Sequence, residues 1–242
     1  MLFCVTACAE NPPPSESPKR SKAEQIAHAA VRAHGGHVAD SAKISFRLRD
    51  RVYTATRAGG IFSYTSEHSD SSGVIRRSLT NEGFTQTING VPVPLSAKDS
   101  LAGAEAVNSV VYFTLLPAFL KDPAVFIHED GTDTLDGKAY HRLKVTFDPV
   151  GGGVDHDDVF LYWIDRETSK MDYLAYSFTV NGGGSRFRKA YNTRRINGIV
   201  FQDYENYKGP APDSLRHISD LYRAGRLKLL SKVEVTEIAV SR

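Results

Sequence analysis

The chain has 242 residues, of which 41% are hydrophobic and 24% are charged, the balance of a globular rather than a disordered protein. Its formal net charge of +2 is too small to indicate nucleic-acid binding, because proteins that bind a duplex carry a clearly basic patch. Both cysteines, Cys4 and Cys8, lie near the start, so the rest of the chain offers neither a disulfide nor a thiolate metal ligand. We expect a monomer with one large domain, no cofactor, no metal and no nucleic-acid partner.

The amino terminus carries the first specific signal. The run Val5-Thr6-Ala7-Cys8 resembles a lipobox, in which small residues permit cleavage and the cysteine sulfur then receives a diacylglycerol. A complete leader has a basic region and an apolar run of about 7–15 residues, and neither precedes Cys8 here. We therefore expect the printed start to lie inside a longer leader, with residues 1–7 as residual signal peptide and Cys8 as the lipidated residue. The alternative is a stray cysteine in a frayed terminus.

A tether follows the cysteine. Residues 9–21 are rich in proline, serine and charge, so they cannot bury a hydrophobic core. We expect residues 8–21 to link a membrane anchor to a folded domain over residues 22–242. By analogy with the usual sorting rule, Ala9 after the cysteine favours the outer membrane, with the domain facing the periplasm in the cell envelope.

The domain begins with a helical pattern between Lys22 and His34. Apolar residues recur there at helical spacing on one face, and they are Ile26, Ala27, Ala30 and Val31. Gly35-Gly36 follows, where a helix often ends in a left-handed glycine. We interpret His28 and His34 as surface or capping residues rather than metal ligands.

A strand pattern with a period of two begins at Ala42, and glycine-containing turns such as Asn89-Gly90 separate the segments. The run 159–164 is continuously apolar, which predicts a strand covered on both faces. Residues 213–224 favour a short helix. The expected strands are 42–49, 51–57, 61–67, 74–80, 84–88, 125–134, 142–147, 159–164, 171–180, 185–191, 199–207 and one or two within 227–240.

An apolar helical segment interrupts the strands between Ser96 and Leu120. It is too short and too interrupted to span a membrane, which takes about 20 apolar residues, and Pro117 should end it. A helix that is apolar on most sides is buried. We therefore predict a mainly β (α+β) fold in which one antiparallel sheet of about 10–11 strands curls into a half-barrel. An amino-terminal helix precedes the sheet, and a helical plug lies on its concave face.

These features resemble a known fold. A helix ending in His-Gly-Gly, an antiparallel half-barrel and helices plugging its concave face are similar to the LolA/LolB lipoprotein-carrier fold. Residues 23–208 also resemble a family of uncharacterised bacterial lipoproteins. The matching stretches are AHGG (33–36), NSVVYFTLLP (108–117), VTFDPVGGG (145–153), DDVFLYWI (157–164), MDYLAYSFTVNGGGSRFRKAYN (171–192) and FQDYENY (201–207). The first resemblance implies a fold rather than a function, and the second implies no residue roles.

Two glycine-rich loops, Gly151–Gly153 and Gly182–Gly184, should lie at one end of the sheet, because a single hairpin separates them. Beside them we predict a polar rim that could bind an anion, formed by Asp155, Asp158, Arg186 and Arg188. The alternative is a pair of flexible hairpin loops in which the arginines pair with Asp157 or Asp158. A calcium site is disfavoured because the acidic run lacks the spaced pattern of a calcium loop. We name no catalytic residue.

Aromatic residues of the plug and the central strands are candidates for an apolar lining or for ordinary core. They are Tyr112, Phe113, Phe119, Phe160, Tyr162, Trp163, Tyr173, Tyr176 and Phe178. An open half-barrel favours a pocket. The leading hypothesis is therefore a non-catalytic, membrane-anchored protein that binds a lipid, an acyl chain or another hydrophobic small molecule. The alternatives are a structural or protein-interaction lipoprotein of the envelope, and a hydrolase that uses the glycine-rich rim.

Overall fold

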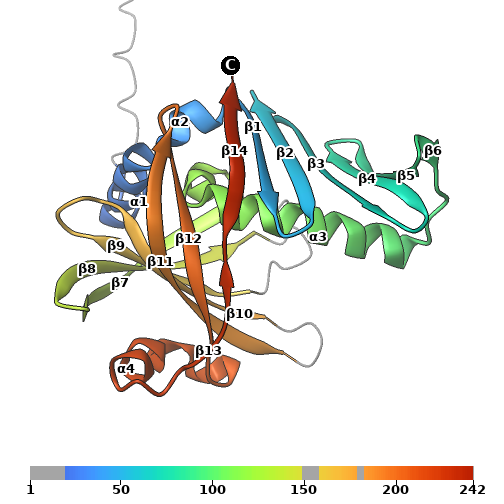
Figure 1. The fold of residues 1–242 in the computed structure, drawn as a ribbon. Helices are drawn as coiled ribbons and strands as arrows, with labels where there is room; N and C mark the ends of the chain where they lie inside the picture. The colour runs from blue at the N-terminus through green and yellow to red at the C-terminus, as the bar shows by residue number, and fades with distance from the viewer. Residues whose placement is uncertain (1–19, 149–157, 179–182, 242) are drawn as a thin grey trace, which may run out of the picture.

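The computed structural model describes residues 20–148, 158–178 and 183–241 (Figure 1). Cys8, the tether before Arg20, the first glycine-rich loop and Asp155 lie outside the described residues. Within the described part, fourteen strands form two antiparallel sheets of seven strands each. Helices lie at the start of the domain, between the sheets and against one outer face.

The N-terminal sheet has the order β14-β1-β2-β3-β4-β5-β6. Its strands are β1 (Lys43–Leu48), β2 (Arg51–Ala58), β3 (Ile61–Asp70), β4 (Gly73–Thr80), β5 (Gly83–Ile88), β6 (Val91–Pro92) and β14 (Val235–Ser241). Alternate residues of these strands face the core, as Ile44 and Phe46 do in β1. The other face of this sheet carries polar residues such as Ser45 and Thr54, so the expected alternation between a buried and a wet face is confirmed.

The C-terminal sheet has the order β13-β12-β11-β10-β9-β8-β7. Its strands are β7 (Val125–Leu135), β8 (Lys138–Phe147), β9 (Phe160–Asp165), β10 (Met171–Phe178), β11 (Gly184–Ile196), β12 (Ile199–Lys208) and β13 (Lys228–Val233). Every residue of β9 is buried, which confirms the prediction of a strand covered on both faces. The outer cover includes η3 (Pro212–His217) and α4 (Ile218–Arg223), which lie below this sheet in Figure 1.

The two sheets meet where β13 leads directly into β14. At this seam the buried carboxylate of Asp203 in β12 accepts hydrogen bonds from the Val235 backbone N–H (3.0 Å) and from Arg194 (2.9 Å). The expected half-barrel is confirmed, but the described residues form fourteen strands rather than about ten or eleven, and these strands divide into two hydrogen-bonded sheets. The last segment changes partner at Glu234, and nothing in its hydrophobic pattern marks that change.

Helix α1 (Lys22–Ala33) starts at a capping box between Ser21 and Glu24 and buries the face predicted from the sequence. Gly35 after it has φ +78°, and a Cβ there would lie 2.0 Å from the Gly198 carbonyl oxygen, so only glycine fits. Short helix α2 (Gly36–Ala39) follows.

The predicted plug is α3 (Ala97–Leu115), which runs through the hollow between the sheets in Figure 1 and is followed by the short helix η1 (Ala118–Lys121). Val107, Val111 and Leu115 are its buried apolar residues. In the described part of the chain, no helix combines the length and the apolar character needed to cross a membrane.

His34 caps the end of α1, as expected, but it is buried rather than on the surface, with 3% of its area exposed. Its Nε2 accepts a hydrogen bond from the Met171 backbone N–H (3.0 Å), and its carbonyl accepts one from the Val200 N–H (2.9 Å). It therefore fixes α1 to β10 and β12. Burial lowers the pKa of His34 to about 3, so the imidazole is neutral at physiological pH.

Candidate ligand-binding cavity

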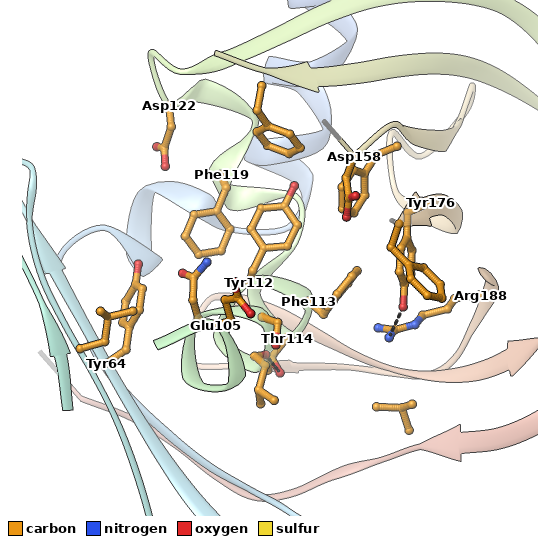
Figure 2. Close-up of a pocket in the computed structure, with 18 of the residues that line it drawn as sticks. Tyr64, Glu105, Tyr112, Phe113, Thr114, Phe119, Asp122, Asp158, Tyr176 and Arg188 are labelled. Carbon is orange, nitrogen blue, oxygen red and sulfur yellow. Dashed lines mark hydrogen bonds between the residues drawn. The ribbon is translucent and has the colours of Figure 1, made fainter. Parts of the chain in front are cut away.

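A cavity of about 770 Å³ lies between the two sheets, with α3 and η1 along it (Figure 2). The N-terminal sheet contributes apolar side chains such as Leu48, Phe62 and Leu79, and the C-terminal sheet contributes Phe147 and Phe160. This volume falls in the range of about 300–1,000 Å³ that is common for small-molecule sites.

Tyr112 of α3 forms the centre of the aromatic wall. Its ring stacks on Phe119 at 5.1 Å between centroids and meets Phe160 edge-on at 5.9 Å. The Tyr112 hydroxyl shares a hydrogen bond of 2.8 Å with the hydroxyl of Tyr162, and burial raises the pKa of both phenols. Both hydroxyls therefore stay neutral and satisfy each other, so this wall is effectively apolar.

Six of the nine predicted aromatic residues line the cavity, namely Tyr112, Phe113, Phe119, Phe160, Tyr176 and Phe178. Tyr162 lies directly behind the wall, bonded to Tyr112. Trp163 and Tyr173 do not line the cavity and belong to ordinary core, the alternative left open from the sequence: both pack with Phe187 in the separate core beneath η3 and α4. The reason is that neighbouring residues of a strand point to opposite faces, and a continuously apolar strand does not reveal which face is which.

Three residues of the predicted polar rim, Asp158, Arg186 and Arg188, line the cavity. The guanidinium of Arg188 lies 4.0 Å from the centre of the Phe113 ring and donates a hydrogen bond to the Tyr176 hydroxyl (3.0 Å). Arg186 lies over the Phe178 ring at 4.9 Å. Their common face follows from their spacing of two residues in β11. Among the described residues, no cluster of three His, Cys, Asp or Glu side chains could hold a metal ion.

The sequence reasoning missed an ion pair at the other side of the cavity. Arg57 of β2 donates from one nitrogen to both carboxylate oxygens of Asp122 (3.0 and 2.9 Å), and its guanidinium lies 4.6 Å from the centre of the Phe119 ring. Arg57 shares its strand face with buried Tyr53 and Ala55, so the alternation could have placed it inside. Asp122 follows η1, and no pattern in the sequence identifies it.

Residues 14–235 match the model of a family of unknown function, DUF6503. The chain belongs to this family. A search of curated proteins finds no significant match.

Solved structures with a similar chain course include a LolA superfamily protein from Nitrosomonas europaea, at 12% sequence identity and a TM-score of 0.49, covering 92% of this chain and 93% of that one. They also include a DUF1329 family protein from Desulfovibrio piger, at 10% identity and a TM-score of 0.42, covering 92% of each chain. The lipoprotein LppX from Mycobacterium tuberculosis matches at 11% identity and a TM-score of 0.26, covering 67% of this chain and 91% of that one.

Proposed function

We propose that this DUF6503 protein is a non-catalytic carrier that binds a lipid or acyl chain in the cavity between its two sheets. The observation that carries the proposal is the cavity itself, about 770 Å³ in volume and walled by the aromatic cluster around Tyr112. A packed interior would have left no room for a ligand. An apolar wall of this kind favours a hydrocarbon chain, because burying apolar surface contributes roughly 25 cal/mol per Å².

The polar groups of the cavity support binding rather than catalysis. The described residues that line it include no histidine and no cysteine, so among them there is neither a thiol nucleophile nor an imidazole to activate a hydroxyl. His34, whose pKa is lowered to about 3 by burial, does not line the cavity and lies in the contact between α1 and the C-terminal sheet.

A tryptophan introduced into the cavity tests the proposal. Ser109 of α3 lines the cavity, whereas Ala106 of the same helix is exposed and does not. We expect Ser109→Trp to weaken binding of the neutral fluorescent probe N-phenyl-1-naphthylamine at least tenfold, while Ala106→Trp leaves it unchanged. Equal binding by wild type and Ser109→Trp would place the probe elsewhere and contradict the proposal. Native mass spectrometry of the envelope-purified protein adds a second test, in which a co-purifying lipid is expected.

We also propose that Cys8 carries a lipid that anchors the carrier in the envelope, at the outer membrane facing the periplasm. Cys4 provides a matched control, because it lies in the same short segment but outside the lipobox-like run. Cys8→Ser should release the protein from the membrane fraction, and Cys4→Ser should not. Continued membrane retention and acylation of Cys8→Ser would exclude this anchor.

A further inference from the structure

Arg188 is an arginine in an aromatic setting, and its hydrogen-bonding capacity is only partly used. One terminal nitrogen donates to the hydroxyl of Tyr176. Its Nε is buried, and within the part of the chain that the structure describes it has no hydrogen-bond partner. Leaving a buried donor of a charged group unpaired is costly. The geometry therefore favours an acceptor on a bound ligand.

The guanidinium is held ready for such an acceptor. The ring of Phe113 lies 4.0 Å from it and the ring of Tyr176 lies 5.3 Å from it. In Figure 2 Arg188 lies at the hydroxyl end of Tyr176, and Phe113 lies on the side toward α3. A guanidinium stacked on aromatic rings is only weakly hydrated, and its planar fork matches the two oxygens of a carboxylate or a phosphate.

The attraction of an anion is confined to the surroundings of Arg188 and is not a property of the whole cavity. The described lining holds three arginines and three carboxylates, of which Arg57 and Asp122 pair with each other. Glu105 and Asp158 also line the cavity, so an anion is disfavoured near them. On β11, Arg186 lies two residues from Arg188 on the same face and adds a second positive charge beside it.

Building on the proposed function, we propose that Arg188, supported by Arg186, binds the anionic headgroup of an amphiphile, a carboxylate or a phosphate. The hydrocarbon tail then lies against the aromatic wall of Tyr112, Phe113 and Phe160. The guanidinium of Arg188 donates to a headgroup oxygen, and Tyr176 keeps the guanidinium oriented. The ligand is thus an anionic lipid rather than a neutral one, with either one hydrocarbon tail or several.

The test compares ligands with the same twelve-carbon tail and different heads, each used below its micelle concentration. Dodecyl phosphate, 1-dodecanol and dodecyltrimethylammonium compete for bound N-phenyl-1-naphthylamine, and inorganic phosphate alone is the tail-free control. The wild type should bind dodecyl phosphate about tenfold or more tightly than dodecanol, as expected for a charge-assisted hydrogen bond in a shielded site. Arg188→Gln should remove that preference and keep the affinity for dodecanol. Arg76→Gln, on the N-terminal sheet outside the cavity, should change neither.

The other outcomes separate the two proposals. Equal affinities for all three dodecyl ligands, or tightest binding of dodecyltrimethylammonium, would overturn the anion site and leave the carrier standing. Binding of inorganic phosphate as tight as that of dodecyl phosphate would overturn the assignment to an amphiphile. Displacement of the probe by none of the ligands would count against the carrier itself. If Arg188→Gln does not fold, Arg188→Lys serves instead: it keeps the charge, loses the fork and should show a reduced preference.

Discussion

The two sheets of the half-barrel share one cavity but differ on their outer faces. The N-terminal sheet presents polar residues outward, such as Ser45 and Thr54, and its buried residues gather on one face. The C-terminal sheet has a core on each face: one includes Tyr162 and Leu174, and the other, under η3 and α4, includes Trp163 and Phe187. The N-terminal sheet is therefore packed on one face only, and the C-terminal sheet is packed on both faces.

This difference indicates how the cavity is supported. Strands that are packed on both faces keep their shape through two independent sets of contacts, whereas a sheet with a wet outer face depends on what fills its inner face. Phe160 of the aromatic wall and the guanidinium of Arg188 both belong to the doubly packed sheet. We therefore expect a substitution on the outer face of the C-terminal sheet to lower the free energy of unfolding much more than one on the outer face of the N-terminal sheet.

The largest expected effect is that of Phe187→Ala, on the outer face of β11. Phe187 is fully buried and contacts the rings of Trp163, Tyr173 and Tyr222. Removing it should lower the free energy of unfolding by about 3–5 kcal/mol, because a cavity remains between the sheet and α4. Urea denaturation measures the change. Thr54→Ala, on the outer face of β2, should cost less than about 1 kcal/mol, and a similar loss in both variants would remove the distinction between the sheets.

Much of this contrast was readable from the sequence. The alternation in β1 predicted one wet face, and the unbroken apolar run of β9 predicted burial on both. The pattern could not assign Trp163 to the outer core, because an unbroken apolar run has no polar partner that marks the outside. Arg57 was missed for the opposite reason. A charged residue in a strand is normally predicted to be exposed, and the partner that allows Arg57 to face inward, Asp122, is distant in sequence and is adjacent only in the folded protein.

The next prediction concerns the free energy of unfolding at low pH, and it depends on His34, which is hydrogen-bonded to the C-terminal sheet. The folded pKa of His34 is about 3, below its ordinary value of 6.5, so between these values the unfolded chain binds a proton that the folded chain does not. The stabilising contribution is complete above about pH 6.5 and is lost as the pH falls toward 3. The slope should reach about 1.4 kcal/mol per pH unit.

His34→Gln is the matched variant, because its side-chain oxygen can accept the hydrogen bond from the Met171 N–H without taking up a proton. Unfolding free energies of wild type and variant at several pH values between 4.5 and 6.5 give the contribution of His34 as a difference, which cancels the titration of the carboxylates. The difference should grow as the pH falls. Parallel curves would mean that His34 is protonated in the folded state and that its burial does not control the acid response.

The smallest expected effect comes from replacing a glycine by alanine, once beside the C-terminal sheet and once in the helix that packs on the N-terminal sheet. A Cβ at Gly209, between β12 and η3, would lie 2.2 Å from the Ser185 Oγ and 3.1 Å from the Ser185 backbone carbon, so Gly209→Ala should cost about 1–3 kcal/mol. A Cβ at Gly103 of α3 would have the far end of the Phe84 ring as its nearest neighbour, at 2.4 Å. Because Phe84 is half-buried and alanine favours a helix by about 1 kcal/mol over glycine, Gly103→Ala should change stability by less than about 1 kcal/mol. Thermal unfolding of both variants measures the difference, and a larger loss for Gly103→Ala would show that the N-terminal sheet is the more tightly packed of the two.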